Sequence, residues 1–358
     1  MSQNHQRERL KVSGTGRPKS RATLRDIARE VDLSVSAVSM ALLDHSRIGA
    51  ETKARVRETA NRLGYVTNSA GRALRAQTAG AIAVIVPNTG AHVFGHSYFM
   101  HVMTGVTAVA NSRESLVFIS TSDDPGNGVS AYEAIMRSRA ADGAILTSAS
   151  VDDTNIGRLV ETGMPVVLLG RFPHLPEAIT VGVDDRNAAF RATEHLIVAH
   201  RRTSLVHISG PLGHQTAIDR RDGFLAAAAK HGASGIVVEG DFSEESGAAA
   251  IAELDERRNG PLGLFVANDE MAYGAITALA AEGISVPGHV SVVGFDDFGL
   301  SRLTTPSITT MSVPAESMAR LATERLYELI DGEEIRERHT VLPVALTIRQ
   351  SCGCPPHQ

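Results

Sequence analysis

The sequence predicts an α/β protein in which a small helical head precedes two doubly wound lobes, each built on a parallel sheet. From residue 81 onward, short apolar runs alternate with segments of helical periodicity, a pattern typical of parallel strands joined by helical crossovers. Residues 22–75 show helical periodicity alone and many arginines. The 358 residues exceed one usual domain, so separate units are expected.

The first two helices of the head are predicted from their start signals. Thr23 and Asp26 have the spacing of a capping box, with a hydroxyl at the N-cap and a carboxylate three residues later. The first helix ends at a turn, since Asp32 tolerates turn conformations and Ser34 can cap the next helix. The apolar positions are Leu24, Ile27, Ala28 and Val31 in the first helix and Val35, Val38, Ala41 and Leu42 in the second.

A third helix is predicted to begin at about Ala50. Its inner face would hold Val56, Ala60 and Leu63, and basic side chains would lie on its outer face. The first two helices and their tight turn have helix-turn-helix geometry, in which the second helix enters the major groove of DNA. The alternative is a small helical domain with a solvated charged face.

The body is predicted as alternating strands and helices. The strands lie at 81–87, 116–120, 143–147, 165–170, 204–209, 235–239, 262–267 and 290–294, with a last one within LPVALTIRQS at 342–351. The longer helices lie at 98–111, 186–199, 216–231 and 269–282. Ligands of parallel sheets bind at the carboxyl ends of the strands, and between two lobes such a site becomes a cleft.

Charge is divided unequally between the head and the body. Residues 1–80 hold 15 Lys and Arg against 7 Asp and Glu, whereas the remainder holds 20 against 33. A basic head on an acidic body would bind nucleic acid at one end, with a steep dependence on salt. Residues 1–21 are polar and rich in Gly, Ser and Arg, so we expect this stretch to be disordered and to add non-specific attraction.

The sequence argues against other classes of protein. It has no apolar signal region and no run of about 18 apolar residues, so we expect a cytoplasmic protein rather than a secreted or membrane-spanning one. A free small-molecule binding protein would not carry residues 22–75. The patterns G-x-G-x-x-G after the first strand, G-x-x-x-x-G-K-[ST] and G-x-S-x-G are missing, so an enzyme on a doubly wound fold is not expected.

The sequence predicts no metal site and no cofactor. Cys352 and Cys354 form a C-x-C at the end of the chain, and two ligands on a frayed tail do not make a zinc site. The two cysteines are therefore interpreted as incidental. His92, His96 and His101 are closely spaced, but no matching carboxylate or cysteine accompanies them.

A joint pattern runs through the head and continues into the body. It consists of Thr23-Leu24-Arg25-Asp26-Ile27-Ala28, Ser34-Val35-Ser36-Ala37-Val38-Ser39, Arg47-Ile48, Glu51-Thr52, Leu63-Gly64-Tyr65 and Asn68. With this pattern, the head resembles that of the lactose-repressor/galactose-repressor family of bacterial transcription regulators, and the likeness continues to about Ser351. The resemblance implies a body with the fold of periplasmic sugar-binding proteins, in which the chain crosses between the lobes three times.

The resemblance also implies domain boundaries. The tail at 1–21 would be followed by the helix-turn-helix domain at 22–67 and by the hinge helix and linker at 68–80. The N-lobe would hold about 81–183 and 315–342, and the C-lobe about 184–314 and 343–351. Residues 352–358 would form a tail.

The head residues that match the family's DNA contacts fall into three groups. Val35, Ser36 and Met40 match base-reading positions. Thr23, Ser34, Ser39, Thr52 and Tyr65 match positions that contact phosphates or support such contacts. Asn68 to Arg75 match the hinge helix, in which Leu74 would wedge into the minor groove.

The head departs from the family pattern at four positions. Met40 replaces an arginine that reads guanine in many members, so the operator half-site should differ. Gly49 replaces a capping serine, which is a small loss. Gly71 replaces an alanine and costs about 1 kcal/mol in a helix, while Thr67 replaces a proline; both changes favour a hinge that is less ordered without DNA.

The resemblance places an effector in the cleft. The matching residues are Tyr98, Phe99, Thr216, Arg220, Phe242, Asn268 and Asp296, with Ser148 and Arg171 as weaker candidates. Carboxylate, amide and guanidinium groups would bind sugar hydroxyls while an aromatic ring covers an apolar sugar face. The alternatives are that Asn268 and Asp296 only cap helices, that Arg220 is a surface arginine, and that Phe242 belongs to the core.

The function implied by the resemblance is that of a homodimeric regulator, in the first instance a repressor. Two heads would bind two half-sites of a near-palindromic operator, and the effector would shift the lobes and thereby the hinge helices. No leucine-heptad tail follows the last strand, so we expect a dimer rather than a tetramer. The sequence leaves open whether the effector is a neutral sugar, a phosphorylated or acidic sugar, or a nucleoside. It also leaves open whether the effector releases DNA or strengthens binding.

Overall fold

The computed structural model describes residues 22–65, 78–123, 128–254 and 261–355. The chain divides into two units, Met1–Ala76 and Gln77–Gln358. The predicted hinge helix, with Asn68, Gly71 and Leu74, lies outside the described residues.

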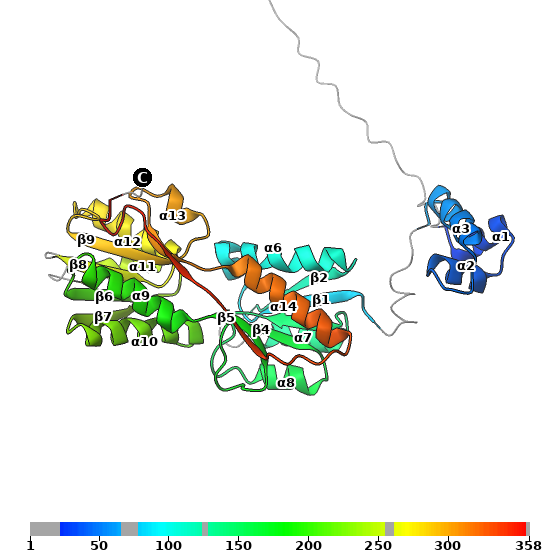
Figure 1. The fold of residues 1–358 in the computed structure, drawn as a ribbon, viewed down its shortest axis with the longest axis horizontal. Helices are drawn as coiled ribbons and strands as arrows, with labels where there is room; N and C mark the ends of the chain where they lie inside the picture. The colour runs from blue at the N-terminus through cyan, green and yellow to red at the C-terminus, as the bar shows by residue number, and fades with distance from the viewer. Residues whose placement is uncertain (1–21, 66–77, 124–127, 255–260, 356–358) are drawn as a thin grey trace, which may run out of the picture. The chain divides into compact units, whose positions relative to one another are not determined.

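The first unit contains the three predicted helices (Figure 1). They are α1 (Leu24–Val31), α2 (Val35–Leu42) and α3 (Ala50–Arg62). Ile27, Val38, Ala41 and Val56 are fully buried where the three helices meet. Val35 does not join this core, because it lies at the start of α2 with 41% of its surface exposed.

The N-lobe is built on a six-stranded parallel sheet with the order β11-β5-β4-β3-β1-β2. Its strands are β1 (Ala81–Val86), β2 (Leu116–Thr121), β3 (Gly143–Leu146), β4 (Val166–Leu169), β5 (Ile179–Val183) and β11 (His339–Leu342). Its helices are α5 (Gly90–Gly95), α6 (Ser97–Ser112), α7 (Val129–Ser138), α8 (Asn155–Glu161) and α14 (Ala315–Ile330). One hydrophobic core forms under α6 and α14, and another under α7 and α8.

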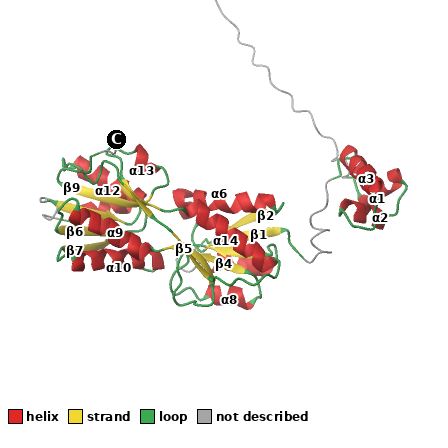
Figure 2. Ribbon diagram, viewed as in Figure 1, coloured by secondary structure: helices red, strands yellow, loops and turns green. Residues whose placement is uncertain are grey.

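The C-lobe repeats this arrangement with the order β12-β10-β9-β8-β6-β7. Its strands are β6 (Ser204–Ser209), β7 (Ser234–Glu239), β8 (Leu262–Val266), β9 (Val290–Asp296), β10 (Thr309–Ser312) and β12 (Ala345–Thr347). Its helices are α9 (Asp185–Val198), α10 (Gln215–Lys230), α11 (Glu244–Ala252), α12 (Asp269–Ala281) and α13 (Leu300–Leu303). Figure 2 shows helices on both faces of each sheet.

The sequence prediction differs from the structure in the last two strands on one side of each sheet. β5, β10 and β11 were not predicted, and the strand expected across 342–351 is confined to Ala345–Thr347. β12 also runs antiparallel to β10, so the C-lobe sheet is not purely parallel.

The chain passes between the lobes three times, and neither lobe is one continuous segment. The passages lie between β5 and α9, between β10 and α14, and between β11 and β12. In Figure 1 the red C-terminal segment runs from one lobe to the other.

In both lobes, glycines let paired helices touch. A Cβ on Gly105 of α6 would lie 2.3 Å from the carbonyl oxygen of Glu316 in α14. A Cβ on Gly223 of α10 would lie 2.1 Å from that of Arg186 in α9. Any larger residue would therefore push the paired helices apart.

The segment after β12 was predicted to be a frayed tail and is not. Cys352 is fully buried, and the Ser351 N–H donates to the Ser307 carbonyl at 2.9 Å. The Ser351 hydroxyl donates to the Val292 carbonyl at 2.7 Å, which ties this segment to β9. Within the described residues, no helix is long and apolar enough to cross a membrane.

Candidate functional site: an exposed helix in the head and a cleft in the body

The second helix of the head presents the predicted base-reading residues on one side. Val35 and Ser36 are exposed and Met40 is half-buried, whereas Val38 and Ala41 face the core. Ser34 caps the helix, because its Oγ accepts from the Ala37 N–H at 3.1 Å. This cap fixes the start of α2, the part of a recognition helix that meets base edges.

The predicted phosphate-contacting residues lie on the three helices of the head or directly beside them. Thr23 caps α1, and both its N–H and its hydroxyl donate to the Asp26 carboxylate, at 2.9 and 2.7 Å. Ser39 and Thr52 are half-buried, and so is Tyr65 just after α3.

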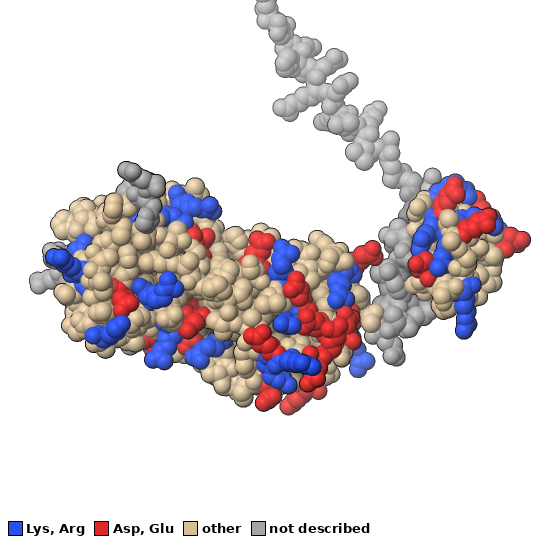
Figure 3. Space-filling view, in the orientation of Figure 1, with Lys and Arg blue, Asp and Glu red and all other residues tan. Residues whose placement is uncertain are grey.

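Several basic side chains of the head form ion pairs within it. Lys53 and Arg57 both pair with Asp44, at 3.1 and 3.0 Å. Arg62 pairs with Glu30 at 2.7 Å. Figure 3 likewise shows acidic side chains beside basic ones on the head, and both signs interspersed over the body.

A cavity lies between the two lobes of the body, and all nine predicted cleft residues line it. They are Tyr98, Phe99, Ser148 and Arg171 from the N-lobe and Thr216, Arg220, Phe242, Asn268 and Asp296 from the C-lobe. The strands behind them end at this cavity, as expected for a site between two doubly wound sheets.

Arg220 forms the buried charged centre of the cavity. Its Nε donates to Asp185 Oδ1 at 2.8 Å, and its Nη2 lies 3.7 Å from Asp296 Oδ1. Its guanidinium carbon sits 3.7 Å from the centre of the Phe295 ring. Arg220 is buried, so the interpretation as a surface arginine is wrong.

The two carboxyl groups around Arg220 are kept from water. Burial raises the pKa of Asp185, and Arg220 opposes this rise. Burial likewise raises the pKa of Asp296 well above its usual range, although the positive charge of Arg220 acts to lower it. Each carboxyl group can therefore take up a proton more readily than an exposed aspartate.

Asn268 and Phe242 form a second wall of the cavity. Asn268 caps α12, since its Oδ1 accepts from the Met271 N–H at 3.0 Å, and its Nδ2 donates to the Phe242 carbonyl at 2.8 Å. Phe242 has a φ of 72° and packs partly against the C-lobe core. Asn268 is thus a helix cap that also lines the cavity, and Phe242 is a core residue that also lines it.

The rings of Tyr98 and Phe99 meet edge to face at the N-lobe side of the cavity. The Tyr98 hydroxyl lies 3.1 Å from Thr147 Oγ1, and burial raises its pKa to about 12. Phe99 is buried in the N-lobe core with its ring 5.3 Å from that of Tyr98.

Hydrogen bonds cross the cleft at several points. Arg171 is 54% exposed, and its Nε and Nη2 donate to both carboxylate oxygens of Asp219 in α10, at 2.8 and 2.9 Å. The Ser97 hydroxyl of α6 donates to Glu270 of α12 at 2.5 Å. The guanidinium of Arg171 is therefore already bound across the cleft.

The closely spaced histidines do not form one group. His92 and His96 line the cavity with their rings 4.4 Å apart, and burial together with His96 lowers the pKa of His92 to about 4. His101 instead stacks on Phe298, with ring centres 4.9 Å apart.

Sequence reasoning missed part of the site. Asp185 and Glu270 were not singled out, nor were the cavity-lining Thr147, His214 and Gln215. Asp185 lies two residues after the end of β5, a strand that the sequence did not predict, so no pattern marked this position as the carboxyl end of a strand. Glu270 lies only two residues after Asn268, which was predicted to line the cleft. This closeness in the sequence could have identified Glu270 as a further cleft residue.

Two family models match the chain. Residues 23–68 match that of bacterial regulatory proteins of the lacI family, and residues 193–352 match a periplasmic binding protein-like domain. The HTH-type transcriptional regulator CelR of Thermobifida fusca is 30% identical over 337 residues, covering 92% of this chain and 98% of the relative. Catabolite control protein A of Priestia megaterium is 26% identical, and the match covers 92% of this chain and 98% of the relative.

Solved structures agree with these matches. The complex of the transcriptional regulator CelR with cellobiose has a TM-score of 0.71 at 26% identity, covering 92% of this chain and all of that one. The lac repressor dimer bound to operator and the anti-inducer ONPF has a TM-score of 0.82 at 23% identity, covering 92% and 99%, and shows the same fold. A helix-turn-helix head, two parallel-sheet lobes and full-length relatives at 30% identity confirm the resemblance, and the chain belongs to the lacI family of transcriptional regulators, which are not enzymes.

Proposed function

We propose that this regulator is a homodimeric repressor whose affinity for a near-palindromic operator is controlled by a neutral polyhydroxylated molecule in the cleft. The proposal rests chiefly on the buried cluster of Asp185, Arg220 and Asp296 in a cavity between the lobes. Carboxylate and guanidinium groups at this spacing suit the paired hydroxyls of a sugar.

The charge of the cleft favours a neutral effector over a phosphorylated or acidic one. Both cleft arginines already have carboxylate partners, Arg220 with Asp185 and Asp296, and Arg171 with Asp219. Glu270 adds a further carboxylate to the lining. An anionic ligand would have to displace one of these partners or lie beside it unpaired, which is costly in a buried site.

Aromatic rings support a sugar-like ligand. Phe242 and Tyr98 line the cavity from opposite lobes and can cover apolar ring faces. The CelR relative was solved with cellobiose, a neutral disaccharide, and this supports the same class of ligand here.

The hydrogen bonds across the cleft suggest how binding reaches the DNA. The lobes can adopt one arrangement that keeps the bonds from Arg171 to Asp219 and from Ser97 to Glu270 and another that breaks them. A ligand between the lobes changes the relative stability of these two arrangements. The lobe that carries β1 follows the predicted hinge, so its reorientation alters the spacing of the two hinge helices. Coupling of this kind is typically about 1–3 kcal/mol.

Two experiments test the proposal. Sequencing of genomic fragments retained by the purified protein at moderate salt should yield an inverted repeat with a central pyrimidine–purine step. Leu74→Ala should weaken operator binding and leave effector binding intact. Retention without a motif, or an unchanged operator affinity in Leu74→Ala, would overturn the DNA-binding part.

Calorimetry tests the effector class. Neutral mono- and disaccharides should bind more tightly than their phosphorylated and uronic-acid counterparts, and Asp296→Asn should weaken binding of the neutral ligand. Arg221→Met is the matched control, because Arg221 pairs with Asp222 and does not line the cavity. Tighter binding of the anionic sugars would refute the charge argument.

A further inference from the structure

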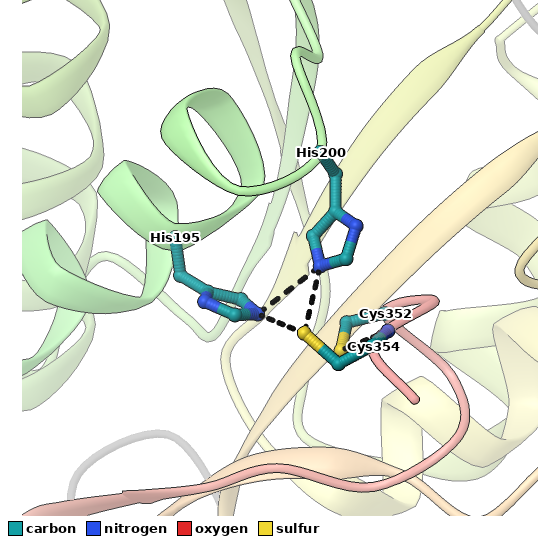
Figure 4. A group of neighbouring side chains, drawn as sticks. All are labelled: His195, His200, Cys352 and Cys354. Carbon is teal, nitrogen blue, oxygen red and sulfur yellow. Dashed lines mark hydrogen bonds between the residues drawn. The ribbon is translucent and has the colours of Figure 1, made fainter. Parts of the chain in front are cut away.

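Four side chains with metal-binding atoms meet in the C-lobe (Figure 4). None of them lines the cleft cavity. His195 lies in the last turn of α9, and His200 follows in the next loop. Cys352 and Cys354 come from the segment after β12. One ligand atom from each residue lies within 4.8 Å of all the others.

The distances among three of these atoms match the edges of a tetrahedron. His195 Nε2 and His200 Nε2 are 3.2 Å apart. Cys354 Sγ lies 3.4 Å from His200 Nε2 and 3.8 Å from His195 Nε2. Tetrahedral Zn²⁺, with bonds of about 2.0–2.1 Å to nitrogen and about 2.3 Å to sulfur, has N···N edges of about 3.3 Å and N···S edges of about 3.5 Å. An ion therefore fits these three atoms with shifts of a few tenths of an ångström, while Cys352 Sγ lies within 4.8 Å of each of them.

Cys352 completes the set from the buried side. Its Sγ accepts from the Thr309 hydroxyl at 3.1 Å and from the Cys354 N–H at 3.5 Å. The Cys352 thiol also donates to the Arg349 carbonyl oxygen at 3.7 Å, a contact that it gives up when its thiolate binds a metal. The Thr309 hydroxyl itself accepts from the Arg349 N–H at 2.8 Å, so its proton is directed at the sulfur.

The backbone holds the two cysteines in this position. Gly353 has a φ of 101°, a conformation that favours glycine, and its Cβ position lies 3.5 Å from His200 Nδ1. Just before it, Ser351 is bonded to Ser307 and Val292, as described above for the end of β12. The C-G-C turn is therefore part of the C-lobe and already faces both histidines.

The surrounding charge is compatible with this geometry. The nearby Arg202 is bound to Ser291, Pro287 and Gly288, and an ion with two thiolates adds no net charge beside it.

We propose that His195, His200, Cys352 and Cys354 form a structural Zn²⁺ site that fastens the end of the chain to α9. Two imidazoles and two thiolates in a tetrahedron select zinc among common divalent ions. Four protein ligands leave no open position, which is the arrangement of structural rather than catalytic zinc. The site is separate from the cleft and does not depend on the effector or the operator.

Metal analysis of the full-length protein tests the proposal directly. After chelation and reloading, one Zn²⁺ should remain per chain, and Zn²⁺ should protect both cysteines from a thiol reagent. Because the chain has two cysteines, complete protection reports on this site alone. Co²⁺ in place of Zn²⁺ should give the visible bands of a tetrahedral ion and a thiolate charge-transfer band.

Variants separate this site from adventitious binding. Cys354→Ser and His200→Gln should each lower Zn²⁺ affinity by more than the ~10–100-fold typical of outer-shell partners, and should abolish the thiolate band or weaken it. His174→Gln is the matched control, because His174 is exposed in the N-lobe, and it should bind Zn²⁺ like the wild type. Zn²⁺ should raise the melting temperature of the wild type and of the control but not of Cys354→Ser.

Several outcomes would overturn the proposal. They are substoichiometric zinc, an octahedral Co²⁺ spectrum, equal loss of zinc in the His174 control, and cysteines that react at the same rate with and without Zn²⁺. A Cys352–Cys354 disulfide in protein purified without reductant, persisting in the presence of Zn²⁺, would also refute it. If a variant fails to fold, the Co²⁺ spectrum and the thiol protection of the wild type still decide the question.

Discussion

Replacing Arg220 with methionine would leave two buried carboxyl groups without their cation. The wild-type guanidinium lies 2.8 Å from Asp185 and 3.7 Å from Asp296, and methionine keeps much of its apolar volume. Removing one partner of a buried ion pair typically costs about 3–5 kcal/mol, because the remaining charge stays desolvated. We therefore expect the free energy of unfolding to fall by about that amount at pH 8.

The cost should depend on pH in a defined direction. Burial already raises the pKa values of Asp185 and Asp296, and loss of Arg220 removes the group that opposes this rise. A carboxyl group with a raised folded-state pKa contributes stability at low pH, and this contribution is lost as pH rises through the folded-state pKa. The destabilisation by Arg220→Met should therefore be smaller at pH 5 than at pH 8.

Urea unfolding of the full-length protein at both pH values measures the effect. Arg221→Met is the control on the same helix, since Arg221 is partly exposed and pairs with Asp222; it should cost less than about 1 kcal/mol. Asp185→Asn added to Arg220→Met should recover part of the loss. A cost below about 1 kcal/mol for Arg220→Met, or one that does not change with pH, would refute the assignment of a buried charge cluster.

Three further predictions follow from other parts of the structure. Gly223→Ala should destabilise the protein by about 1–3 kcal/mol, because the added Cβ would meet the backbone of α9. Gly157→Ala in α8 should stabilise it by about 0.5–1 kcal/mol, because the added Cβ enters open space. The melting temperatures of the two variants should therefore shift in opposite directions. Burial raises the pKa of Asp269 to about 8, so stability should fall as pH rises from 6.5 to 8.5, and an unchanged slope in Asp269→Asn would contradict this. Met40→Arg should make the protein select guanine at one position of each operator half-site, with about 1–3 kcal/mol of discrimination against the other bases. Binding-site selection measures this, and the same preferred operator in the variant and the wild type would contradict it.

The sequence predicted best those features that depend only on residues close together in the chain. The caps at Thr23 and Ser34 and the long apolar strands were predicted within a residue or two, because capping and strand burial are encoded locally. β10 was missed because its sequence, Thr-Thr-Met-Ser, reads as polar, although its first three residues are buried beneath α9. Only the neighbouring strands make that position internal.

The candidate sites divide in the same way. Arg220 and Asp296 could be placed in the cleft by motif, but the partner Asp185 depends on which strands are adjacent. The cysteines illustrate the limit more sharply. Cys354 and His200 are separated by 154 residues, and nothing near either residue in the sequence points to the other.

The three passages between the lobes have a consequence for the gene. A premature stop codon directly after Pro314 removes α14 and β11 from one lobe and β12 from the other, so a single truncation leaves both sheets with missing edges. Neither lobe can be expressed from a continuous coding segment. Nonsense alleles should therefore behave as nulls up to the codons for the last strand, and complementation by separate lobe fragments should fail.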